Sequence, residues 1–149
     1  MNSFFEPDSY SSLVARINAL TPDTQRQWGT MNPGQMMAHV SGGLDFALGT
    51  TPTKHSVVGK LFGWMVKSNA YNDKSFGQGA PTVPSIKMTD DKHFETEKKH
   101  LLGLLEKLYG RGVTNTTKYP HPFFGNLTGE QWGMHVYKHI DHHLRQFGV

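Results

Sequence analysis

Four of the nine histidines fall within nine positions close to the C-terminus, at positions 135, 139, 142 and 143. Residues four apart in an α-helix lie on one face, with their Cβ atoms about 5 to 6 Å apart. Two imidazoles at this separation can both reach one metal ion at about 2.0 to 2.1 Å. Three pairs have suitable spacing: His135 with His139, His139 with His143, and, three apart, His139 with His142. Because every pair contains His139, we predict it as a ligand whichever pair is used.

A third ligand has to come from another element, because two imidazoles on one helix rarely suffice. His39 is the candidate, since it lies on an apolar helical stripe with Met36, and Gly43, one turn on, leaves room beside it. A single histidine on such a face is usually a hydrogen-bonded core residue, so a structural role for His39 stays open. We predict a divalent-metal site formed by His39, His139 and His143.

The remaining histidines have other predicted roles. His135 is either a pocket wall beside the metal or a half-exposed residue. His142 is expected to be exposed, because it lies about 100° around the helix from His143. Asp141 falls on the far side of that helix, and no general base or other catalytic residue is identifiable. Surface positions are expected for the three histidines near charged or loop residues, His55, His93 and His100.

The composition excludes several classes of function. The 149 residues contain no cysteine, so any metal must be held by imidazole and oxygen. The net charge of +3 is small and the basic residues are scattered, so we expect no nucleic-acid partner. No apolar run approaches the ~20 residues of a membrane span, and the start MNSFFEPDSY lacks the features of a signal peptide. We therefore expect a cytoplasmic protein without a membrane partner.

Apolar residues recur at three- and four-residue steps in four segments, which predicts four main helices. Asn32 before Pro33 indicates a helix start, and Thr128 with Gln131 has the pattern of a capping box. Gly110 is the expected stop of the third main helix. Since no strand-type alternation is present, we predict an all-α protein with one domain over residues 1–149. Its main helices are expected at about residues 7–20, 33–47, 91–110 and 129–147.

The long connection after the second main helix has two predicted parts. The first is a short extra helix at about residues 55–66, although Gly59 and Gly63 each weaken it by about 1 kcal/mol relative to alanine. Its apolar positions are Val58, Leu61, Phe62 and Met65. The second is a Gly- and Pro-rich loop from about Asn69 to Asp90, and such loops often act as lids or binding segments. The predicted fold is a four-helix bundle with long crossover loops.

Two sequence segments match a known arrangement of ligands. MNPGQMMAHV places His39 shortly after a proline-containing helix start, and KHIDHHLRQ places a histidine pair four apart, followed three residues later by Gln146. In both respects the sequence resembles the DinB-like superfamily of metal-binding four-helix bundles, which includes the bacillithiol- and mycothiol-dependent transferases. The resemblance implies a DinB-like bundle, with His39, His139 and His143 as ligands and Gln146 in the pocket wall.

The resemblance has one departure and one refinement. Where that group frequently ends in Arg-Gly-Gln, the chain reads Leu-Arg-Gln, which shifts Arg145 by one position. The HPFFG and DHHLRQFGV segments are most similar to an uncharacterised bacterial subfamily. Fold and metal site are therefore implied more directly than any particular reaction, and a homodimer is expected by analogy only.

Three neutral imidazoles leave open positions on a divalent ion, as catalytic sites do. Zinc, nickel, iron and manganese are all compatible with this donor set. Such an ion lowers the pKa of a bound water or thiol and so generates a nucleophile near neutral pH. The sequence thus predicts a metal-dependent enzyme with a small-molecule substrate, either a transferase that activates a low-molecular-weight thiol or a hydrolase. The alternative is a non-catalytic metal- or ligand-binding, stress-associated module.

Overall fold

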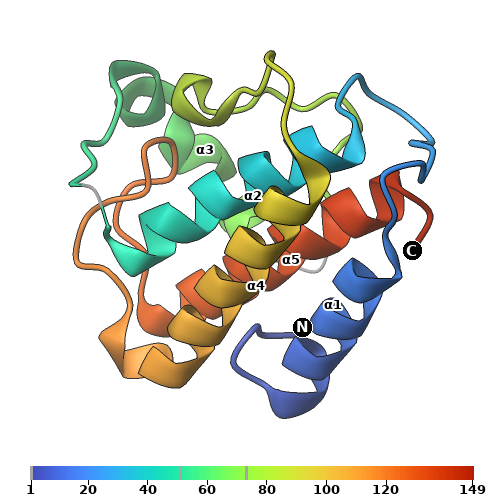
Figure 1. Cartoon of the computed structure of the whole chain (residues 1–149). Coiled ribbons are helices and arrows are strands. Elements are labelled where there is room, and N and C mark those ends of the chain that lie inside the picture. The colour runs from blue at the N-terminus through green and yellow to red at the C-terminus, as the bar shows by residue number, and fades with distance from the viewer. Residues whose placement is uncertain (1, 51, 73) are drawn as a thin grey trace.

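The computed structural model describes residues 2–50, 52–72 and 74–149 (Figure 1). In this part of the chain the regular structure is helical, apart from one isolated bridge between His121 and Gly125. The four longest helices are α1 (Pro7–Ala19), α2 (Pro33–Leu48), α4 (Phe94–Arg111) and α5 (Gly129–Gln146). The shorter pieces are η1 (Gly59–Gly63), α3 (Trp64–Val66), η2 (Lys67–Ala70), η3 (Pro84–Ile86) and η4 (Val113–Asn115). The prediction of an all-α fold is confirmed.

Local capping explains where the two helices that carry the candidate ligands begin. The Asn32 side chain accepts a hydrogen bond from the Gln35 backbone N–H, and the Gln35 side chain accepts one from the Asn32 N–H, so α2 starts with a complete capping box. Thr128 and Gln131 form the same box at the start of α5, as predicted. These interactions set the starting point of each helix, and therefore which side chains face inward.

The predicted end of α4 at Gly110 is wrong by two residues. The helix continues through Arg111, and Gly112 follows it with a positive φ of 73°. This conformation is strained for residues with a Cβ, so the second glycine of the GRG sequence is the better terminator.

The four long helices surround one hydrophobic core. α2 packs against α4 and α5, and α1 packs against the same two helices, so helices that follow one another in the chain lie mostly on opposite corners (Figure 1). The connections from α1 to α2 and from α4 to α5 cross between such corners, whereas the longest connection, from α2 to α4, joins two helices that pack against each other. Trp132, Leu105 and Ile17 are among the core side chains with at most 1% exposure. None of the helices described has both the length and the apolar character needed to cross a bilayer.

The extra helix is present, but its orientation is the reverse of what the apolar pattern suggests. Helical structure runs through residues 57–70, with a π-helical turn at η1. Its apolar positions Val58, Leu61, Phe62 and Met65 are all more than half exposed. Gly59 and Gly63 are the buried positions, and a Cβ on either would overlap the Phe123 carbonyl oxygen. The glycines that weaken the helix locally are thus what lets it pack closely against residues 122–126.

We expect Gly63→Ala to destabilise the protein by about 1 to 3 kcal/mol, because the added methyl group meets a backbone carbonyl that cannot easily move. Gly103→Ala is the matched control: no atom lies within 4 Å of its added Cβ, so the better helix propensity should stabilise α4 by up to about 1 kcal/mol. Urea denaturation monitored by circular dichroism measures both. Equal stability of the two variants would contradict the packing of α3 against Phe123.

The predicted loop from Asn69 to Asp90 is irregular except for the end of η2 and for η3. Its second half is anchored at Ile86, which is 7% exposed and packs closely against Gly42 of α2. Its start is held by the buried ammonium of Lys138, which donates hydrogen bonds to the carbonyls of Asn69 and Asn72. The segment therefore lies across α2 and α5 and contributes backbone carbonyls to the interior.

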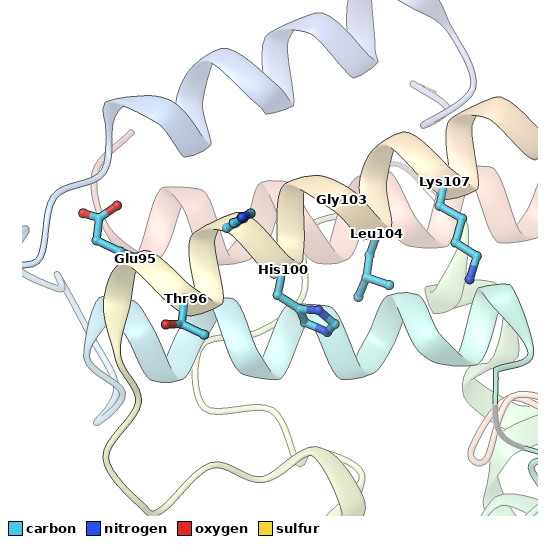
Figure 2. Close-up of a pocket in the computed structure, with 7 residues that line it drawn as sticks. Glu95, Thr96, His100, Gly103, Leu104 and Lys107 are labelled. Carbon is cyan, nitrogen blue, oxygen red and sulfur yellow. The ribbon is translucent and has the colours of Figure 1, made fainter.

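An open hollow lies along the outer face of α4 (Figure 2). All of its lining residues come from that helix: Glu95, Thr96, Lys99, His100, Gly103, Leu104 and Lys107. His100 is exposed there, as predicted. Because the hollow contains none of the three predicted ligands, it is separate from the candidate metal centre.

Candidate metal centre

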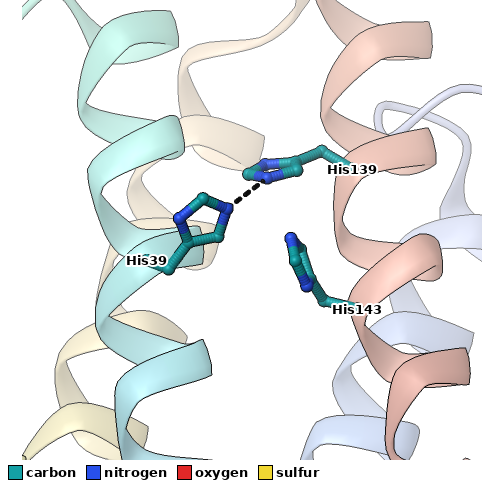
Figure 3. Close-up of side chains that lie close together, drawn as sticks. All are labelled: His39, His139 and His143. Atoms are coloured by element: carbon teal, nitrogen blue, oxygen red, sulfur yellow. Dashed lines mark hydrogen bonds between the residues drawn. The ribbon is translucent and has the colours of Figure 1, made fainter. Parts of the chain in front are cut away.

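The three predicted ligands, His39 of α2 and His139 and His143 of α5, point toward one another in the interior (Figure 3). The ring centroid of His39 lies 4.9 Å from that of His139 and 4.6 Å from that of His143. The centroids of His139 and His143 are 4.9 Å apart. One nitrogen from each ring can be chosen so that all three lie within 4.8 Å of one another. A pair on one helix and a third residue a hundred positions earlier in the chain thus converge.

These separations suit a single ion. Two nitrogens bound at about 2.0 to 2.1 Å with an angle near 90° to 110° at the metal lie about 2.9 to 3.4 Å apart, and at most about 4.2 Å. The Nε2 atoms of His39 and His139 are 2.9 Å apart. A separation of 4.8 Å has to shorten by about 1.4 to 1.9 Å to reach this range, which side-chain rotations provide. The arrangement could bind a metal without movement of the helices.

Two of the rings are held by hydrogen bonds that direct Nε2 toward the centre. His39 donates its Nδ1–H to the Ile86 carbonyl at 2.8 Å. His143 donates its Nδ1–H to Oε1 of Gln146 at 2.8 Å, and the Gln146 amide donates in turn to the Trp28 carbonyl at 2.9 Å. A neutral imidazole protonated on Nδ1 has its lone pair on Nε2, so both rings are in the tautomer that binds a metal.

The predicted pocket-wall residue Gln146 therefore has a more specific position. It is 4% exposed and contacts His143 from behind, opposite the side that faces His39. Its distance of three residues from His143 places both side chains on one helix face.

His139 is the ligand whose protonation has to change. Since His39 has no proton on Nε2, the 2.9 Å contact between the two Nε2 atoms requires His139 to donate its own Nε2–H. A metal bound between them needs both lone pairs, so His139 must switch to the Nδ1–H tautomer. Gly43 gives its ring the necessary room, because a Cβ at that position would lie 2.9 Å from Cε1 and Nδ1 of His139. The sequence pattern alone predicts this room beside His39 instead.

Burial keeps all three rings neutral. The pKa of His39 and that of His139 are both lowered below 6.5, mainly by removal from water and, for His139, also by the neighbouring histidines. Burial and the proximity of His39 lower the pKa of His143 to about 3. At pH 7 the three imidazoles are therefore uncharged, so a metal ion does not have to displace an extra proton from any of them. Only the tautomer of His139 has to change.

His135 lies next to this cluster but does not belong to it. Its ring is 8% exposed and parallel to that of His139, with 6.1 Å between centroids, and its Nδ1–H donates to the Ala70 carbonyl. Of the two predictions for His135, the half-exposed one is wrong. His142 is half-buried between Trp28 and Phe76, because the 69–90 segment covers it, so the prediction that it is exposed is also wrong.

His121 is a buried residue that the sequence analysis did not place. Its Nδ1 accepts hydrogen bonds from the backbone N–H groups of Phe123 and Phe124, and its ring lies 5.0 Å from that of His135. Burial lowers the pKa of His121 to about 2. The surrounding α5 residues come from a distant part of the chain, so the local sequence HPFFG does not reveal this environment.

The other two histidines expected at the surface differ from each other. His93 is exposed and caps α4 by accepting a hydrogen bond from the Thr96 N–H. His55 is half-buried and donates its Nε2–H to the Phe123 carbonyl. The surface prediction is therefore correct for His93 but not for His55, which joins the extra helix to the 121–125 turn.

The acidic residue closest in sequence to the ligand pair points away from it, as predicted. Asp141 forms ion pairs with Arg16 at 2.8 Å and with Arg145 at 2.9 Å. Arg145 has a 60% exposed side chain and is thereby assigned to the outer face of α5. Among the described residues, the groups that lower the pKa of His139 by their charge are histidines, and no carboxylate shifts that pKa.

Gln146→Leu should weaken metal binding by about 10- to 100-fold, because it removes the acceptor that holds the His143 ring and its tautomer. Gln146→Glu keeps an acceptor oxygen at the same position and should retain affinity within a few-fold. Competition with a chromophoric chelator measures both constants. A Leu variant that binds as tightly as the Glu variant would show that Gln146 does not support His143.

The comparisons with known proteins find one family. Residues 6–148 match a family described as a protein of unknown function, DUF1569. No curated protein and no solved structure matches the chain significantly. Because the match covers almost all of the 149 residues, from the first turn of α1 through both ligand helices, the chain belongs to the DUF1569 family.

Proposed function

We propose that this protein binds one divalent metal ion through His39, His139 and His143 and uses it as a metal-dependent enzyme. The observation that carries the proposal is the convergence of three imidazoles from two helices, those of His39 and His143 buried and that of His139 half-buried. Three nitrogen ligands leave at least one coordination position open for a substrate or water, whereas structural zinc sites usually have four protein ligands. The resemblance to the DinB-like superfamily supports the same ligand set and the same type of bundle.

Within this proposal, activation of a low-molecular-weight thiol is the chemistry we favour. A thiol that coordinates the ion loses its proton to solvent and becomes a thiolate nucleophile, without help from a protein base. Hydrolysis of a substrate by metal-bound water usually also involves a positioned carboxylate or histidine. The nearest acidic residue on α5, Asp141, is occupied by Arg16 and Arg145. A thiol-dependent transferase therefore fits the residues around the centre better than a hydrolase does.

The second candidate is a module that binds metal or ligand without turnover. It is favoured by the same surroundings. No carboxylate in the described part of the chain shifts the pKa of His139, and the neighbouring rings, His135 and His142, are packed against other side chains. In that case the metal would hold α2 to α5.

Cobalt substitution separates these functions. The protein is loaded with Co(II), and its visible spectrum is recorded before and after addition of small thiols such as bacillithiol, mycothiol and glutathione. We expect about one Co(II) per chain and new sulfur-to-cobalt charge-transfer absorption on addition of a thiol. A spectrum that does not respond to any thiol would favour the structural role, and absence of stoichiometric metal would contradict the site itself.

Loading of His139→Ala serves as the control for adventitious cobalt at the six histidines outside the centre. If thiol binding is observed, a thiol-transfer screen with electrophilic small molecules identifies the reaction. Hydrolase activity with no response to thiols would overturn the transferase proposal but keep the metal centre.

A further inference from the structure

The extra helix presents an apolar surface to solvent, which we call the 57–65 face. Its six large side chains are between 56% and 74% exposed: Val57, Val58, Leu61, Phe62, Trp64 and Met65. Elsewhere in the described residues, only Tyr119, at 43%, is an exposed large apolar side chain. Concentration of nearly all such groups on one short segment is typical of an interaction surface rather than of scattered surface residues.

Close packing and hydrogen bonds hold the helix that carries this surface against residues 122–126. The opposite side of the helix is formed by Gly59 and Gly63, which pack directly onto the Phe123 backbone. The Ser56 N–H donates to the Pro122 carbonyl and the Lys67 ammonium donates to the Asn126 carbonyl, one near each end of the helix. The helix lies at the periphery of the molecule (Figure 1), and its apolar side chains are exposed.

The charged residues in the segments that carry and support the face are lysines, and Asp45 and Asp73 are the nearest acidic residues in sequence to the helix. Positions 46–72 contain Lys54, Lys60 and Lys67 and no aspartate or glutamate. The segment that supports the helix, residues 116–127, contains Lys118 and likewise no acidic residue. Both segments together therefore carry four positive charges and no negative charge, although the whole chain has a net charge of only +3.

The tryptophan on this face is prepared for an apolar environment. The indole N–H of Trp64 donates to the Leu61 carbonyl at 3.1 Å, although the side chain is 73% exposed. Its only hydrogen-bond donor is thus satisfied within the helix, so burying the ring leaves no unpaired polar group. The other five side chains of the face have no polar group, so the face offers no directional contacts to a specific protein partner.

We propose that the 57–65 face binds peripherally to the surface of an anionic lipid bilayer. Its apolar side chains enter the boundary between headgroups and acyl chains, while the lysines contact lipid phosphates and carboxylates, as in other interfacial amphipathic helices. This goes beyond the proposed metal chemistry and replaces the sequence-based expectation that there is no membrane partner. Pairing of two copies through this face is disfavoured, because it would bring the same positive charges together.

Vesicle co-sedimentation of the full-length protein tests the proposal. We expect binding to phosphatidylcholine vesicles that contain phosphatidylserine, at least roughly tenfold weaker binding to pure phosphatidylcholine, and loss of binding at high salt. The tryptophan emission should shift to the blue on binding through Trp64, because Trp132 is 1% exposed and Trp28 is half-buried against His142. The double variant Phe62→Ser with Trp64→Ser should bind at least roughly tenfold more weakly.

A matched pair of charge variants isolates the lysines. Lys54→Gln with Lys60→Gln should weaken binding by roughly tenfold or more, whereas Lys99→Gln with Lys107→Gln, on the outer face of α4, loses the same charge and should change it little. Phe62 and Trp64 are exposed apolar positions, Lys54 and Lys60 are exposed as well, and Lys99 and Lys107 lie on the outer surface of α4. Unchanged melting curves verify the fold of each variant.

Three results would overturn the proposal. One is equal binding to neutral and anionic vesicles, and another is no vesicle binding at all. The third is concentration-dependent dimerisation that the Phe62→Ser and Trp64→Ser variant abolishes in the absence of vesicle binding, which would assign the face to a second copy of the chain. None of these results affects the cobalt experiment, so the two proposals fail independently.

Discussion

His139→Ala should lose its metal, while His135→Ala should keep it. His139 supplies one of three nitrogens at the centre, whereas His135 is stacked beside it with its Nδ1 bonded to the Ala70 carbonyl. Binding free energies of about 10 to 16 kcal/mol at four-ligand zinc sites correspond to about 3 to 4 kcal/mol for each ligand, so removal of one costs about a hundredfold or more in affinity. Elemental analysis after chelator-free desalting and competition titrations measure the difference.

Thermal unfolding provides the control for this pair of variants. Zinc at about 100 times its dissociation constant stabilises a protein by about 2.7 kcal/mol, which raises Tm by roughly 5 to 10 °C for a chain of this size. We expect this increase for the wild type and for His135→Ala, and none for His139→Ala. Equal metal retention in both variants would disprove the ligand assignment, even if each variant is destabilised without metal.

Metal-free protein should lose stability steeply as the pH falls below 6.5. Four buried histidines and the half-buried His139 have a lowered pKa in the folded state; the buried ones are His39, His121, His135 and His143. In the folded state the pKa is about 2 for His121, about 4 for His135 and about 3 for His143. Below pH 6.5 the unfolded chain therefore binds protons that the folded chain does not, so protonation favours unfolding.

The sign and window of this effect follow from the direction of the shifts. Stability is fully present above 6.5, the ordinary pKa of histidine, and decreases as the pH falls toward the folded values. Each such histidine contributes a slope of up to about 1.4 kcal/mol per pH unit, and several together amount to several kcal/mol between pH 7 and pH 5.

Urea denaturation with a chelator present, at pH 7, 6 and 5, measures this slope. His121→Asn should reduce it, because the amide oxygen can accept the same backbone hydrogen bonds from Phe123 and Phe124 without titrating. Exposed His100 gives the control, since His100→Gln should leave the slope unchanged. A stability that is independent of pH between 7 and 5 would contradict the burial of these rings.

The pH experiment also separates the metal centre from the alternative raised by the sequence, in which His39 is an ordinary core histidine. In that alternative His39 would be held by its bond to the Ile86 carbonyl alone, and zinc would not change the acid sensitivity. A bound metal competes with protons for the ligand nitrogens, so zinc should shift the loss of stability to lower pH. The same measurement repeated with zinc therefore distinguishes a ligand from a structural residue.

Local sequence determined where the helices begin and which site residues share a face of α5. Capping residues such as Asn32 and Thr128 act within one turn, so α2 and α5 begin where their own sequences predict. The pair His139 and His143 shares a helix face because of helical periodicity alone, and Gln146 reaches His143 for the same reason. These features depend on neighbours a few residues away, so no knowledge of the fold is needed to predict them.

Only the tertiary structure decided which distant groups meet. His39 reaches the pair because α2 packs against α5, and its tautomer depends on a carbonyl of Ile86, 47 residues away. The orientation of the extra helix was mispredicted for a related reason. Apolar periodicity indicates the face that could be buried, but close approach to the Phe123 carbonyl allows only glycine, so the glycine face packs inward. Steric fit between backbones far apart in sequence decided this, and amphipathic pattern does not encode it.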